Sequence, residues 1–126
     1  MNSTELREHV MERAKKSDLE SERIGKERED FVEAILKEMK GEGIINDFLR
    51  TSKFSFADIQ MGIDFYVVII EKNYRVIPIS VTGPYGALME DKQPVVGVNL
   101  EIPVEKRKMI VKKELLNIFH IFQKLS

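Results

Sequence analysis

The sequence predicts an α/β protein in which a helix, four strands and a closing helix follow one another around a mixed central sheet. The first observation is a pair of runs rich in β-branched and aromatic residues, 62–70 and 74–82, separated by the turn-forming residues 71–73. Such a pair predicts a β-hairpin, which we place at the centre of the fold. The second observation is that apolar residues recur at helical spacing in segments 26–40 and 103–125, which predicts two amphipathic helices packed on the sheet.

Length and composition limit the class of protein. With 126 residues the chain fits one domain that buries a self-sufficient core. The absence of cysteine excludes disulfides and thiolate chemistry, and the net charge of −1 gives no bulk attraction to nucleic acid. No apolar run approaches the roughly 20 residues that cross a bilayer, and residues 1–16 are charged throughout, so we expect a soluble, cytoplasmic protein without a membrane partner. The charged fraction of 33% favours a thermophilic source.

The N-terminal region is expected to be a helical arm, residues 1–25, that precedes an α/β domain of residues 26–126. Capping residues and thinly spaced apolar side chains predict a helix over residues 4–16. A Ser-x-x-Glu pattern at residues 17–20 predicts a second helical start, and Gly25 interrupts that second helix. The arm is either a charged peripheral helix or a helix that binds a partner or forms a dimer.

The remaining elements are less sharply marked. Residues 44–50 predict a first strand, residues 51–58 an irregular link and residues 94–100 a buried fourth strand. Pro103 is well placed to open the last helix. The apolar residues of that helix spread over more than one side, so we expect either burial on two sides or a homodimer contact through the C-terminal helix.

The hairpin also carries a resemblance to a known family. Gly62-Ile63-Asp64-Phe65, followed by the strand from Val76 to Thr82, resembles the core of the PD-(D/E)XK nuclease-like superfamily, which has the restriction-endonuclease-like fold. The resemblance extends over about residues 26–125 through the order of elements. It implies an α/β sandwich whose mixed sheet of about four strands is flanked by helices.

The resemblance also implies a site. Asp64 falls on the metal-binding aspartate of the family, and Glu33, with Glu29 as second choice, falls on the glutamate of its first helix. Ser80 and Thr82 fall where the family has a second acid and a lysine. Mg²⁺ or Mn²⁺ would be the cofactor of an active member, because these ions prefer oxygen ligands. Apart from the resemblance, Asp64 next to Gly62 can be a turn residue hydrogen-bonded to backbone amides.

Ser80 and Thr82 depart from the pattern of the family, and these two departures decide the function that we expect. Serine is a poor metal ligand and threonine carries no charge, and the loss of one stabilising group commonly costs on the order of 10² to 10³ in rate. We therefore expect a non-catalytic domain with an eroded metal site that is either associated with nucleic acid or structural. One alternative is an active nuclease with ligands relocated to Asp58 or residues 90–92. Another is a plain interaction or dimerisation module.

Strand register gives a geometric test of this site. A two-residue turn would place Asp64 on the face opposite to Ser80, whereas a link of three residues pairs Ile70 with Tyr74 and brings Asp64 opposite Ser80. A bulge near Pro78 would correct the phase as well, because proline cannot donate to the ladder. We predict one of these two arrangements.

A group of basic residues marks the first half of the last helix, where cations gain nothing from the helix dipole. These residues are candidates for contact with the phosphates of DNA or RNA, or form a solvated outer face. They are Lys106, Arg107, Lys108, Lys112 and Lys113.

Overall fold

The predicted α/β class and the predicted order of elements are both confirmed. The computed structural model of the chain describes residues 2–51, 62–71, 73–83 and 94–124, and within this part the side chains of residues 13–18 are not described. The elements are α1 (Ser3–Gly41), β1 (Asp47–Arg50), β2 (Phe65–Ile70), β3 (Tyr74–Thr82), β4 (Val95–Gly97) and α2 (Val104–Lys124). The first and fourth strands are shorter than predicted.

The four strands form one mixed sheet in the order β1-β2-β3-β4. β1 and β2 pair antiparallel, as do β2 and β3, whereas β3 and β4 are parallel. Ile70 lies opposite Tyr74, so the link between β2 and β3 has three residues, as predicted. Pro78 faces Tyr66 without interrupting the register, so the three-residue link is the one of the two predicted arrangements that sets the phase between β2 and β3.

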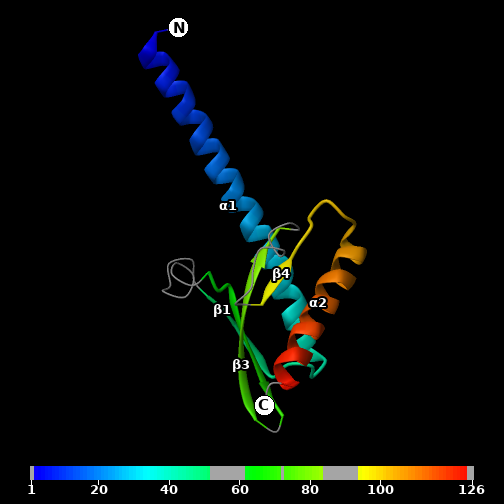
Figure 1. Cartoon of the computed structure of the whole chain (residues 1–126). Coiled ribbons are helices and arrows are strands. Elements are labelled where there is room, and N and C mark those ends of the chain that lie inside the picture. Colours follow the sequence, from blue (N-terminus) through cyan, green and yellow to red (C-terminus); the bar gives the residue numbers. More distant parts are fainter. Residues whose placement is uncertain (1, 52–61, 72, 84–93, 125–126) are drawn as a thin grey trace.

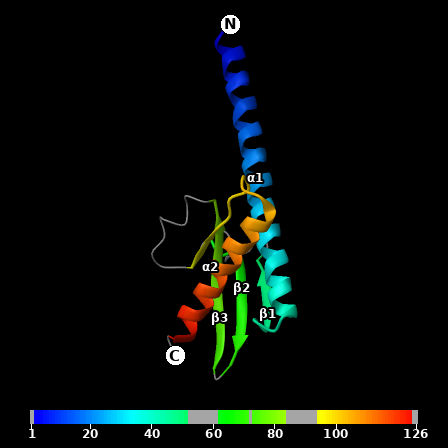
Figure 2. The same cartoon turned by 90° about the vertical axis from the view of Figure 1, so that its right-hand side faces the viewer.

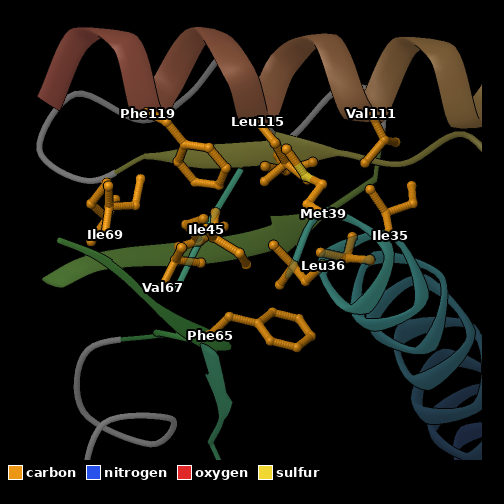
Figure 3. Close-up of a cluster of buried hydrophobic side chains, with 14 of the residues drawn as sticks. Ile35, Leu36, Met39, Ile45, Phe65, Val67, Ile69, Val111, Leu115 and Phe119 are labelled. Carbon is orange, nitrogen blue, oxygen red and sulfur yellow. The ribbon is translucent and has the colours of Figure 1, made fainter. Parts of the chain in front are cut away.

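Both helices cover the same face of the sheet, which we call the inner face (Figure 1). This arrangement differs from the expected sandwich, in which helices flank the sheet. Buried side chains alternate with less buried ones along β2, as expected for a strand with one covered face. The core between sheet and helices is shown in Figure 3, and the largest of its fully buried side chains are Leu36, Met39, Phe65, Ile77, Ile79 and Leu115.

The opposite side of the sheet, which we call the outer face, is apolar over β1 to β3. The strand registers place seven of its side chains in adjoining rows: Leu49, Tyr66, Val68, Ile70, Tyr74, Val76 and Pro78. Four of them are exposed, with exposed fractions of 64% for Leu49, 52% for Ile70, 67% for Tyr74 and 45% for Val76. Among the described residues, no helix packs on this face.

The predicted break in the N-terminal region is wrong, because α1 is a single helix of 39 residues. At about 1.5 Å per residue it is about 58 Å long. Figures 1 and 2 show its N-terminal half projecting beyond the sheet, and Leu6, Val10, Met11 and Leu19 are exposed there. Neither helix, as far as the structure describes it, is long and apolar enough to cross a bilayer.

The helix instead continues to Gly41, and Gly43 follows two residues later. Gly43 adopts a φ of 80°, and its amide bonds to the carbonyl of Lys40, while the amide of Ile44 bonds to that of Met39. This is a Schellman cap, in which glycine avoids the strain of a left-handed conformation. Because the cap uses Ile44, and Ile45 is buried in the core, β1 begins only at Asp47.

We expect Gly25→Ala to raise the free energy of unfolding by about 0.5–1 kcal/mol, since alanine restricts the unfolded chain and favours the helix. A Cβ at Gly25 meets no atom within 4 Å. Gly43→Ala is the control, and it should destabilise because its backbone requires a positive φ. Urea unfolding followed by circular dichroism measures both changes. A loss of stability in Gly25→Ala would contradict the continuous helix.

Candidate functional site

Arg50, at the end of β1, is surrounded by three acidic side chains of α1. Its Nη1 donates to Asp30 Oδ1 and to Glu33 Oε2, each at 2.7 Å, and its Nε lies 3.8 Å from Glu29 Oε1. The guanidinium carbon is 6.0 Å from the centre of the Phe65 ring, the residue opposite Arg50 in the sheet. We call Arg50 and the three acids the Arg50 cluster.

In this cluster Glu33, the metal ligand predicted on the first helix, forms an ion pair with Arg50. Burial by itself would lower the pKa of Arg50, but the hydrogen bonds to Asp30 and Glu33 and the charge of Glu29 outweigh it and raise that pKa. The second oxygen of Glu33 lies 3.7 Å from Lys37 Nζ. A metal ion could use Glu33 only by competing with these two cations.

Asp64 lies just before β2, and its carboxylate meets the backbone of β3. Oδ2 accepts a hydrogen bond from the amide of Val81 at 2.7 Å. The amide of Asp64 donates to the carbonyl of Ile79, although Ile79 faces Phe65 in the register, so Asp64 departs from the regular pairing in the manner of a bulge. This contact agrees with the alternative that Asp64 hydrogen-bonds backbone amides at the end of the strand.

We expect Asp64→Ala to lower the free energy of unfolding by about 1–2 kcal/mol, because the partly buried amide of Val81 loses its acceptor. Asp64→Asn retains an acceptor oxygen and should lose less than half as much. Urea unfolding of the two variants at the same pH gives the comparison. Equal stability of all three proteins would mean that the hydrogen bond contributes nothing to folding.

Ser80 and Thr82 project from the side of the sheet opposite to α1. They alternate along β3 with Ile79 and Val81, which pack into the core on the inner face. Ser80 Oγ donates to the carbonyl of Gly62 at 2.6 Å. Since Glu33 belongs to α1, the sheet separates it from Ser80 and Thr82. The predicted roles of these residues in metal binding remain predictions.

The described residues contain no group of side chains that matches a metal site. Nowhere in these parts of the chain do three or more His, Cys, Asp or Glu side chains gather in a way that could hold an ion. Asp58 and residues 90–92, to which the ligands were expected to relocate in an active enzyme, lie outside the described residues.

Three of the five basic residues predicted to face nucleic acid form hydrogen bonds or ion pairs with neighbouring parts of the protein. Lys108 Nζ lies 2.7 Å from Glu38 Oε2 of α1, and Lys112 Nζ lies 2.9 Å from Glu42 Oε1. The pKa of Lys108 is raised chiefly by its hydrogen bond to Glu38.

Arg107 is used in a similar way. It donates from Nη2 to the carbonyls of Leu100 and Ile102, and its guanidinium lies 4.9 Å from the centre of the Phe31 ring. Only Lys106 and Lys113 of the five are exposed. Nucleic-acid binding by this group stays a prediction.

Sequence reasoning missed Arg50, which organises the acids of α1. Its only local signal was a cation at the end of a predicted strand, whereas its partners lie about 20 residues earlier in the chain. Acids spaced three and four apart on a helix, such as Asp30, Glu33 and Glu29, could have suggested a shared cation.

Comparisons with known proteins do not assign the chain to a class. No family model, no curated protein and no solved structure matches it significantly. The class supported by the structure is therefore a small α/β protein with a four-stranded mixed sheet that carries both helices on one face. The likeness to the PD-(D/E)XK superfamily remains a hypothesis.

Proposed function

We propose that this protein is a non-catalytic interaction module that pairs with a second copy of itself through the outer face of its sheet. The observation that carries the proposal is the row of seven apolar side chains on that face, four of them exposed. Monomeric proteins rarely leave a contiguous apolar patch of this kind uncovered, and larger patches mark interaction sites.

The scarcity of charged residues on the outer face favours an apolar partner. One third of all residues are charged, yet along β1 to β3 the outer face carries Asp47 as its only charged residue within the strands, and Asp47 is bonded to Lys40 at 3.0 Å. Phosphate backbones need cations, which this face does not present. A second copy offers the same uncharged surface, and two sheets commonly pack face to face about 10 Å apart.

The size of the face predicts a weak dimer. A stable interface usually buries about 800 Å² per partner, whereas three strands of about six residues span a plane of only about 300 Å². Burial of seven half-exposed apolar side chains contributes about 1 kcal/mol each, which is of the same order as the cost of association. The remaining few kcal/mol correspond to a dissociation constant of about 1 mM.

The outer side of α2 is a less suitable surface for the pair. It exposes Met109, Ile110, Leu116 and Ile121, but Lys106 and Lys113 are exposed on the same helix. Two copies that met there would bring like charges together, which opposes association. The sheet face is uninterrupted by such charges.

Sedimentation velocity of the full chain from about 10 µM to 1 mM tests the proposal. We expect the mean mass to rise from that of one chain, 14.6 kDa, towards twice that value. A constant monomer mass over this range would overturn it. In parallel, labelled DNA and RNA are incubated with Mg²⁺ or Mn²⁺; cleavage that Asp64→Ala abolishes would establish the competing nuclease function instead.

A further inference from the structure

We infer that Arg28 is the anchor of a binding site for an oxyanion, a phosphate or carboxylate group carried by a small molecule. The site is a cavity of about 420 Å³ lined by residues of α1 and of the segment that joins β4 to α2. That volume falls within the range of small-molecule sites. The inference does not depend on the outer face of the sheet.

Arg28 has a buried donor without an acceptor. Its Nε is shielded from solvent and makes no hydrogen bond, and none of its nitrogen atoms takes part in a hydrogen bond or ion pair with another described residue. A guanidinium that is partly removed from water without a partner is costly, so native proteins usually provide one. A bound oxyanion would partner the charge of the guanidinium through its Nη groups.

The guanidinium of Arg28 packs against the backbone. The group lies against Gly83, directly after β3, so closely that a Cβ at this glycine would fall 2.8 Å from Arg28 Nη2. Any residue other than glycine would therefore displace the arginine. The planar donor fork of the guanidinium matches the two oxygens of a carboxylate or phosphate.

The remaining lining supports an anion with an attached body. Asn99 contributes a side-chain amide whose oxygen already accepts from the Glu101 amide at 3.0 Å, which leaves its NH₂ group as a second donor. Arg23 and Glu27 also line the cavity but neutralise each other at 2.7 Å. Ile24 and Leu100 provide apolar walls. Glu101, at the exposed rim, favours a singly charged ligand over one with several charges.

The test titrates the ¹⁵N-labelled full chain with inorganic phosphate and, separately, with acetate, against sodium chloride at the same ionic strength. We expect saturable amide shifts at Gly83 and residues 99–101 with at least one of the two anions and none with chloride. Tighter binding of phosphate identifies a phosphate ligand, and equal or tighter binding of acetate a carboxylate. The absence of a saturable response to both anions overturns the inference.

Variants assign the response to the arginine. Arg28→Met should weaken binding at least tenfold, and Arg28→Lys should weaken it by less, because lysine keeps the charge without the fork. Lys26→Met, at an exposed position of the same helix, should bind as the unchanged protein does. The dispersion of the amide spectrum shows that each variant is folded. If Arg28→Met is folded and binds as tightly as the unchanged chain, the site is not where we place it.

Discussion

Val76→Lys is expected to convert the dimer into a monomer and to weaken self-association at least a hundredfold. Val76 lies in the middle of the outer face, opposite Val68, and is 45% exposed. In a two-fold symmetric pair each substituted side chain meets the same surface of its partner, so two ammonium groups would enter one apolar interface. Sedimentation velocity at about 500 µM measures the loss directly. Thermal unfolding should change little, because a lysine on an exposed strand face remains solvated.

Met109→Lys is the matched control, because it replaces an even more exposed apolar side chain, 73% exposed, with the same cation on α2. We expect it to leave the dimer intact. The reverse result, in which Met109→Lys dissociates the dimer and Val76→Lys does not, would place the contact on the C-terminal helix. The outer face would then need another explanation.

Arg50→Met should lower the free energy of unfolding by about 1–2 kcal/mol. The substitution leaves Glu29, Asp30 and Glu33 close together without their cation and removes two hydrogen bonds of 2.7 Å. Hydrogen bonds to charged groups contribute about 1.5–3 kcal/mol, and screening by solvent reduces this contribution because the side chains of the cluster are partly exposed. Urea unfolding at neutral pH measures the loss.

Two further variants separate this effect from general charge changes. Arg23→Met also removes a 2.7 Å ion pair, but its side chain is 62% exposed, so we expect a loss below about 0.5 kcal/mol. Adding Glu33→Gln to Arg50→Met should recover part of the lost stability, because one of the unpaired charges is removed. Equal losses for Arg23→Met and Arg50→Met would show that the Arg50 cluster is no more than a surface ion pair.

Local patterns in the sequence were sufficient for the elements and for the hairpin. The unbroken run of β-branched and aromatic residues from Phe65 to Ile70 marks a strand, and three link residues set the register that pairs Ile70 with Tyr74. Both features depend on residues only a few positions apart. They could therefore be predicted without knowledge of the rest of the chain.

The candidate site could not be predicted in the same way. Asp64, Glu33 and Ser80 were selected as polar residues at the ends and edges of elements, but the face on which each acts depends on where α1 packs. Placing both helices on the inner face separates Glu33 from Ser80 and leaves Arg50 as the partner of Glu33. No pattern within a single segment of the sequence predicts on which face of the sheet the helices pack.

By itself, the sequence determined which segments are helices and strands and how β2 pairs with β3. Tertiary structure alone decided that Gly25 stays helical, that the cations of α2 bind acids of α1, and that Arg28 lies against Gly83. The physical reason is the range of the interactions. Backbone preference and side-chain alternation act over a few residues, whereas ion pairs and packing join residues that lie tens of positions apart and form only once the helices have settled on the sheet.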